Sequence, residues 1–157
     1  MPISTPEKRL LLFGASRGLG LAIAEEHLKL GWRVVATARQ ETGTALHGLV
    51  DEANGRLDIE IVDITDPNQV AALHGRLESK RFDLLFVNAG VTNDDRETIA
   101  DVSTEEFVRV MVTNALSPMR IVEAMARQFG WELRVNLDEK QQLGGMMIDA
   151  CGAFGKG

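Results

Sequence analysis

Apolar residues follow two kinds of pattern along most of this chain. Stretches of strand length lie at residues 9–13, 32–38, 57–62 and 82–87. Residues 57–62 alternate between apolar and acidic side chains, whereas residues 82–87 are nearly all apolar, which predicts a central strand buried on both faces. After each of the four stretches, apolar residues recur at the three- and four-residue spacing of a helix, over residues 19–30, 44–53, 66–77 and 104–129. Strands that alternate with helices in this way predict a parallel sheet with right-handed crossovers and helices on both faces. We therefore expect an α/β fold, a three-layer doubly wound parallel sheet with strand order 3-2-1-4.

Capping signals mark several helix boundaries. Asp66 before Pro67 is typical of an N-cap followed by proline at the first helical position. Ser103 with Glu106 three residues later forms a capping-box pattern. Gly31 predicts the stop of the first helix.

The last predicted helix contains a proline. Pro118 has no N–H to donate to the carbonyl of Asn114, four residues earlier. We expect the helix to kink at this point and to leave the Asn114 carbonyl free.

Residues 128–157 do not continue the pattern. Residues 131–137 alternate between apolar and polar side chains, which makes them a candidate fifth strand, and residues 144–157 contain five glycines and are expected to be loose. We therefore divide the chain into a folded domain, residues 1–127, and an atypical tail, residues 128–157.

Composition excludes several classes of partner. Of 157 residues, 45% are hydrophobic and 25% are charged, as in an ordinary soluble globular protein. The net charge of −6 argues against a nucleic-acid partner, which would require a basic face. No apolar run is long enough to cross a bilayer and no secretory leader opens the chain, so we expect no membrane association and a cytoplasmic location. The single Cys151 has no metal-ligand neighbours, and we expect no metal site.

A glycine-rich turn, Gly14-Ala15-Ser16-Arg17-Gly18-Leu19-Gly20, follows the first predicted strand and opens the first predicted helix. A helix start offers unpaired N–H groups and the positive end of its dipole, and glycines let a pyrophosphate approach the backbone. Glycines alone are a weak indication because many turns use them, but here the flanking strand and helix are those of a phosphate site. We therefore assign to cofactor binding the residues Gly14, Ser16, Arg17, Gly18, Leu19 and Gly20.

Further candidate site residues end the other three predicted strands. They are Arg39 after the second strand, Asp63 and Ile64 after the third, and Asn88, Ala89 and Gly90 after the fourth. The carboxyl ends of parallel strands meet at one edge of the sheet, and ligands bind beyond that edge. The four groups therefore predict one dinucleotide site.

The end of the second strand indicates which dinucleotide is bound. An acidic residue there accepts the ribose 2′-OH of NAD, whereas an arginine accommodates the 2′-phosphate of NADP. This chain has Arg39 and no carboxylate at that position, and Arg17 adds a second guanidinium. The pattern favours NADP(H) over the alternative of two solvated surface arginines. It also disfavours a methyltransferase, which would normally place an acid at this strand end.

Together these motifs resemble the short-chain dehydrogenase/reductase family, specifically its NADP-preferring members, over about residues 8–127. The matching residues are Gly14, Arg17, Gly18, Gly20, Arg39, Asp63, Asn88, Ala89, Gly90 and Asn114. The resemblance implies a Rossmann fold and an ancestry of hydride transfer between NADP(H) and a carbonyl or alcohol. It also implies that Asp63 binds the adenine amino group and that Asn88-Ala89-Gly90 lines the cofactor and steadies the central strands.

The family's proton relay is the part that this chain lacks. The resemblance implies that Asn114 holds a water in that relay, and the alternative is an ordinary Asn in a kinked helix. The family's tyrosine, lysine and serine would follow, but the chain has no tyrosine, with Gln141 at the serine spacing and Phe154 at the tyrosine spacing. The family's lysine position would lie beyond Gly157. We therefore expect an impaired enzyme in which Asn114 is a catalytic remnant.

Two alternatives to an enzyme remain open. One is a cofactor-binding or regulatory subunit that pairs through the helix at 104–129 with a full-length relative or with a second copy. In this alternative we expect the apolar stripe from Met111 to Met125 of that helix to be uncovered. The other is a degenerate, truncated product.

Overall fold

The computed structural model describes residues 7–93, 98 and 100–129. Its described part contains a four-stranded parallel sheet in the order β3-β2-β1-β4, so the predicted order 3-2-1-4 is confirmed. The strands are β1 (Arg9–Phe13), β2 (Arg33–Ala38), β3 (Leu57–Ile61) and β4 (Leu84–Val87). Each begins and ends within two residues of its predicted range.

The strand pairing aligns the carboxyl ends that the sequence singled out. In the parallel ladders Phe13 is opposite Val87 and Ala38 is opposite Ile61. The residues that follow all four strands therefore emerge along the same edge of the sheet, the edge at which ligands bind in folds of this kind.

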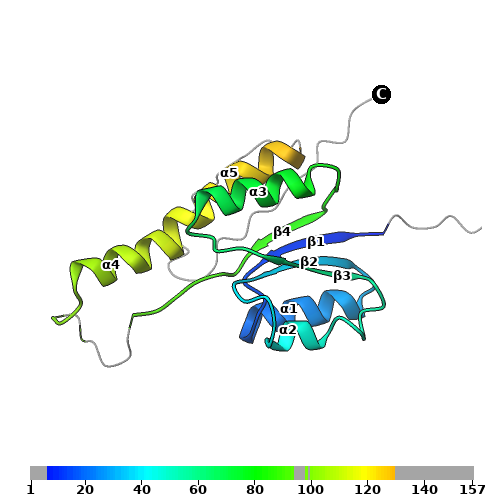
Figure 1. Ribbon diagram of the computed structural model, residues 1–157, viewed down its shortest axis with the longest axis horizontal. Helices are drawn as coiled ribbons and strands as arrows, with labels where there is room; N and C mark the ends of the chain where they lie inside the picture. Colours follow the sequence, from blue (N-terminus) through cyan, green and yellow to red (C-terminus); the bar gives the residue numbers. More distant parts are fainter. Residues whose placement is uncertain (1–6, 94–97, 99, 130–157) are drawn as a thin grey trace, which may run out of the picture.

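Helices cover both faces of the sheet (Figure 1). One layer contains α1 (Gly18–Lys29) and α2 (Ala45–Gly48), and the other contains α3 (Pro67–Leu77) and α5 (Ser117–Phe129). Alternate residues of β1 are buried on opposite faces, Leu10 and Leu12 in the core with α1, and Leu11 and Phe13 in the core with α3 and α5. A fully buried side chain of this size stabilises a fold by about 1.5–3 kcal/mol, so β1 serves both cores.

The predicted capping residues act as expected. The Asp66 carboxylate accepts the backbone N–H groups of Asn68 and Gln69, at 2.9 and 3.4 Å, before Pro67 begins α3. The Ser103 hydroxyl accepts the Glu106 N–H at 3.1 Å. Gly31 follows α1 with φ +83°, a backbone conformation that favours glycine.

The second helix is shorter than predicted. A helix was expected over residues 44–53, but α2 ends at Gly48 and turns follow it. Only Leu46 of α2 is buried, so little packing offsets the low helix propensity of Gly48. Asn54 and Gly55, both with positive φ, then lead into β3.

The last predicted helix is interrupted before Pro118. It divides into α4 (Thr104–Met111), a π-helical turn η1 (Val112–Leu116), and α5. The N–H and the hydroxyl of Ser117 both donate to the carbonyl of Val112, five residues earlier, the hydroxyl at 2.8 Å. The irregularity thus lies where the sequence placed it, and it takes the form of a π turn.

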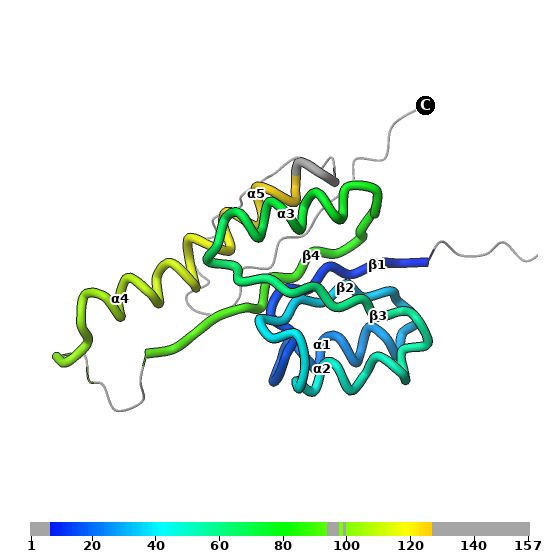
Figure 2. The backbone as a smooth tube through the Cα atoms, viewed as in Figure 1, coloured from blue at the N-terminus to red at the C-terminus, as the bar shows by residue number. Residues whose placement is uncertain are grey.

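The apolar stripe of this helical segment is only partly uncovered. The α4 helix extends beyond the sheet, away from the two helical layers (Figure 2). The apolar side chains exposed on α4, η1 and the start of α5 are Phe107, Val108, Met111, Leu116 and Met119. The expectation that the stripe is uncovered as far as Met125 is wrong, because Ile121 and Met125 are fully buried in the core with α3.

The fourth strand lies at an edge of the described sheet. Within the described residues β4 pairs with β1 alone, and Leu85 is its only buried residue. The predicted burial of this strand on both faces is therefore not present in the described part. The candidate fifth strand at 131–137 and the tail at 128–157 fall outside the described residues, apart from the last two residues of α5.

Candidate functional site

A cleft of about 390 Å³ lies at the carboxyl edge of the sheet, and residues that follow or end every strand line it. This volume is within the usual range for a small-molecule site. The lining residues are Gly14, Ser16, Arg17, Thr37, Ala38, Arg39, Val62, Asp63, Ile64, Thr65, Asn88, Ala89, Gly90, Val91, Arg109 and Thr113. Of the predicted site residues, Gly18, Leu19, Gly20 and Asn114 are not among them.

The glycine turn is held from both neighbouring strands. The N–H of Gly14 donates to the hydroxyl of Thr37 at 3.1 Å, and the N–H of Ala15 donates to the Thr37 carbonyl at 3.0 Å. From the other side, the Asn88 side-chain amide donates to the Gly14 carbonyl at 3.1 Å. These bonds satisfy the buried backbone of the turn and fix its position before any ligand binds.

Close backbone approaches explain two of the glycines. Gly14 has φ +82°, and a Cβ there would lie 2.5 Å from the Cα of Ala89. A Cβ at Gly20 would overlap the Gly14 carbonyl and lie 2.7 Å from the Asn88 amide nitrogen. Gly18 has open space around it but a φ of +57°, so its backbone conformation favours glycine.

The N-terminal end of α1 gives one end of the cleft a positive electrostatic potential. Arg17 is the N-cap and makes no side-chain capping bond, and the first turn contains no acidic residue. The N-terminal N–H groups and the positive end of the helix dipole are therefore not neutralised by an acid in the first turn, which suits an anion. Leu19 in the same turn is 66% exposed and lies outside the cleft lining.

Asp63 is a preorganised acceptor after β3. Its Oδ1 accepts the Thr65 hydroxyl at 2.7 Å and the Thr65 N–H at 2.9 Å. These two hydrogen bonds lower the pKa of Asp63, with a smaller contribution from the positive charge of Arg39. The carboxylate is therefore ionised throughout the neutral range, at the end of the cleft that also contains Arg39.

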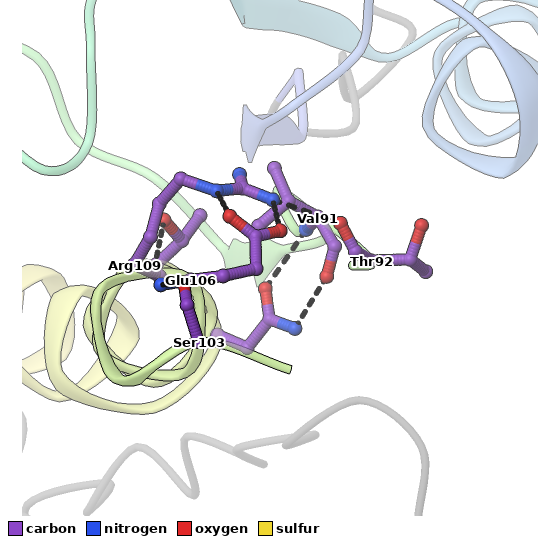
Figure 3. Close-up of polar contacts among 7 residues, drawn as sticks. Val91, Thr92, Ser103, Glu106 and Arg109 are labelled. Atoms are coloured by element: carbon purple, nitrogen blue, oxygen red, sulfur yellow. Dashed lines mark hydrogen bonds and ion pairs between the residues drawn. The ribbon is translucent and has the colours of Figure 1, made fainter. Parts of the chain in front are cut away.

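Asn114, on the π turn, clamps the segment after β4. Its Oδ1 accepts the N–H of Val91 at 2.8 Å, and its Nδ2 donates to the Val91 carbonyl at 2.7 Å (Figure 3). A Cβ on Gly90 would lie 3.3 Å from Asn114 Oδ1, so this contact is close. Asn114 thus supports the cleft wall rather than lining it.

Sequence reasoning missed several lining residues, among them Thr37, Thr65, Val91, Arg109 and Thr113. A single polar residue among the apolar residues 34–38 was a usable signal for Thr37, which is almost fully buried. Arg109 gave only a local signal, its three-residue spacing from Glu106. Its approach to the cleft depends on how α4 meets the segment after β4.

Two other features limit the chemistry of the described part. No group of three or more His, Cys, Asp or Glu residues there could hold a metal ion. No helix in the same residues is long and apolar enough to cross a membrane.

Comparison with known proteins agrees with this fold. The family model for short chain dehydrogenases matches residues 8–136, and this chain therefore belongs to the short-chain dehydrogenase family. Among curated relatives, 3-oxoacyl-(acyl-carrier-protein) reductase FabG of Escherichia coli (strain K12) is 32% identical over 122 residues, covering 76% of this chain and 48% of the relative. The chain spans about half the length of the curated relatives it matches.

Solved structures show the same Rossmann-type arrangement. A short-chain dehydrogenase/reductase from Burkholderia multivorans with bound NADP is 55% identical with a TM-score of 0.74, over 78% of this chain and 54% of that chain. A carbonyl reductase from Pseudomonas aeruginosa PAO1 in complex with NADP is 31% identical with a TM-score of 0.73, over 77% of this chain and 56% of that chain. The resemblance stated from the sequence motifs is thus confirmed.

The environment of Asp63 predicts how stability changes with pH. We expect Asp63→Asn to lower the free energy of unfolding by about 0.5–1 kcal/mol at neutral pH, because hydrogen bonds to an ionised acceptor are roughly twice as strong as neutral ones. The folded pKa lies below the unfolded value of about 3.9, so the advantage of the wild type is complete at neutral pH and disappears as the pH falls through the folded pKa. Urea unfolding of both proteins across this pH range measures the difference, and a difference independent of pH would contradict the assignment.

Proposed function

We propose that this chain binds NADP(H) in the cleft at the carboxyl edge of its sheet. The observation that carries the proposal is the pair of exposed arginines, Arg17 and Arg39, that line the cleft, with Arg39 directly after β2 at the chain position where NAD-binding folds have an acidic residue. Two guanidinium groups suit the 2′-phosphate that distinguishes NADP from NAD. The bound NADP in two structural relatives supports the same assignment.

The described residues fit the remaining parts of such a cofactor. The pyrophosphate would bind at the glycine turn, where Gly14, Ser16 and Arg17 line the cleft at the N-terminal end of α1. The ionised Asp63 would accept the adenine amino group, and Ala89 and Gly90 would line the other half of the dinucleotide. In this proposal residues 1–127 form the cofactor-binding domain.

We further propose that this chain by itself catalyses little or no hydride transfer. NADPH, when bound, supplies a hydride to a carbonyl carbon, and the carbonyl oxygen must then receive a proton. In the family a tyrosine handles that proton, and this sequence contains no tyrosine. In this proposal the described residues bind and orient the cofactor, and none of them transfers the proton.

The exposed apolar side chains of α4, η1 and α5 favour a second candidate function, a cofactor-binding subunit that pairs with another chain. Phe107 and Met119 are 59% and 61% exposed, and Val108, Met111 and Leu116 lie along the same segment. Several exposed apolar side chains along one helical segment are typical of a protein–protein interface. The partner would be a second copy of the chain or a full-length relative.

Cofactor preference tests the main proposal. We expect NADPH to raise the melting temperature of the pure chain more than NADH does at equal concentration, because only a ligand that binds the folded state stabilises it. Arg39→Ala should weaken NADPH binding by about 10- to 100-fold, the loss of a charge-assisted contact, and should change NADH binding little. Lys29→Ala removes an exposed cation at the other end of α1 and is the matched control. Equal responses to the two nucleotides would refute the proposal.

A turnover assay tests the proposal that this chain by itself catalyses little or no hydride transfer. With NADPH and a panel of ketones and aldehydes, we expect the purified chain to show no absorbance decrease at 340 nm beyond the substrate-free rate. A family member that keeps the tyrosine and lysine serves as the positive control. Reproducible NADPH consumption that copurifies with the chain would show that another proton donor is present.

Size-exclusion chromatography with light scattering tests pairing. We expect the wild type to contain dimers or larger species, and Phe107→Glu to shift it towards the monomer by placing a charge in the apolar surface. Leu30→Glu is the matched control, since Leu30 is 65% exposed at the C-cap of α1, away from the apolar side chains of α4 and α5. If the wild type is monomeric alone and with a full-length relative, the second candidate is excluded.

A further inference from the structure

Arg109 links α4 to the segment that follows β4. Its Nε donates to Glu106 Oε2 at 2.7 Å, and its Nη2 donates both to Glu106 Oε1 at 2.6 Å and to the Thr92 carbonyl at 2.9 Å (Figure 3). Arg109 also lines the cleft. One planar side chain thus connects a helix, the segment after a strand, and the cleft.

The geometry indicates a positional role rather than a large contribution to stability. The Arg109 side chain is 47% exposed, and exposed ion pairs at three-residue spacing in a helix contribute little to folding. The two contacts with Glu106 fix the guanidinium plane, and this orients Nη2 towards the Thr92 carbonyl. The carboxylate of Glu106 also balances the charge that Arg109 would otherwise present to a ligand.

The segment at 91–92 needs such a connection because α4 packs weakly. None of the side chains of α4, all of which belong to the described part of the chain, is buried. The bonds of Asn114 to Val91 and of Arg109 to Thr92 join consecutive residues after β4 to one helical segment. Together they hold this wall of the cleft in one conformation.

The sheet order places this wall opposite the arginines proposed to bind the 2′-phosphate. In the order β3-β2-β1-β4, the glycine turn after β1 lies between the end of β2 and the end of β4. A dinucleotide with its pyrophosphate at the turn and its 2′-phosphate at Arg17 and Arg39 therefore extends its other half, the nicotinamide half, towards Val91 and Thr92.

We propose that Arg109 is a positioning residue that, oriented by Glu106, fixes the segment at 91–92 for the nicotinamide half of the dinucleotide. The inference rests on the proposed function. Arg109 acts through the Thr92 carbonyl and not by its charge on the cofactor phosphates. Ordering the wall before the cofactor arrives removes a conformational cost from binding.

Two ligands distinguish an effect at the nicotinamide half from a general loss of binding. NADPH occupies both halves of the proposed site, whereas adenosine 2′,5′-bisphosphate occupies only the half at Arg17 and Arg39. By isothermal titration calorimetry we expect Arg109→Gln to weaken NADPH binding by about tenfold. The same variant should leave the affinity for adenosine 2′,5′-bisphosphate unchanged, and Arg120→Gln, an exposed cation on α5, should change neither affinity.

Two further variants distinguish the positioning role of Arg109 from attraction of the cofactor by its charge. Glu106→Gln leaves Arg109 with its charge but weakens the contacts that orient it. If Arg109 positions Thr92, Glu106→Gln weakens NADPH binding, whereas if it attracts phosphate by charge, the same change tightens it. Arg109→Lys keeps the charge but cannot reproduce the planar contacts to both partners, so we expect it not to rescue affinity.

Each failure has its own signature. A wild type that binds neither ligand overturns the proposed function. If the wild type binds both ligands, two results overturn the positional role alone. Either Arg109→Gln leaves the affinity for NADPH unchanged, or it weakens the affinity for both ligands equally. If Arg109→Gln does not fold, Glu106→Gln decides, and unchanged or tighter NADPH binding there overturns the role.

Discussion

The backbones that follow β1 and β4 lie so close together that a side chain at Gly14 would collide with Ala89. The rest of the site depends on this close approach. The Asn88 amide closes it by donating to the Gly14 carbonyl, and Gly20 packs on the same carbonyl from the start of α1. The end of one strand, the end of another and a helix N-terminus thus form one unit. Gly14, Asn88 and Ala89 of this unit line the cleft, so backbone contacts fix this part of its wall.

Much of this arrangement was predictable because it depends on local signals and on topology. The apolar run at 10–13 followed by glycines indicated a strand and a phosphate turn, and Asp66 before Pro67 indicated the start of a helix. Once the alternation of strands and helices implies a parallel sheet, residues at strand ends are brought together whatever the details of packing. For that reason Arg39 and Asp63 could be assigned to the cleft from their positions alone.

The missed features depend on contacts between distant parts of the chain. The Thr37 hydroxyl matters because the turn after another strand donates to it, and Arg109 matters because α4 returns to the segment after β4. The short α2 reflects how few of its side chains are buried, which no local pattern reports. Pro118 indicated an irregular helix, but it could not distinguish a kink from the π turn that lets Ser117 donate twice to Val112.

The first strand has apolar side chains facing both ways, since Leu10 and Leu12 enter one core while Leu11 and Phe13 enter the other. A slip of one position would exchange the two sets and cost little hydrophobic burial, so burial by itself specifies the alignment of this strand only weakly. The glycine turn at its end removes the ambiguity, because only one alignment brings Gly14 to both the Thr37 hydroxyl and Ala89. The segment proposed to hold phosphate therefore also fixes the alignment of the central strand, so its residues serve the sheet as well as the site.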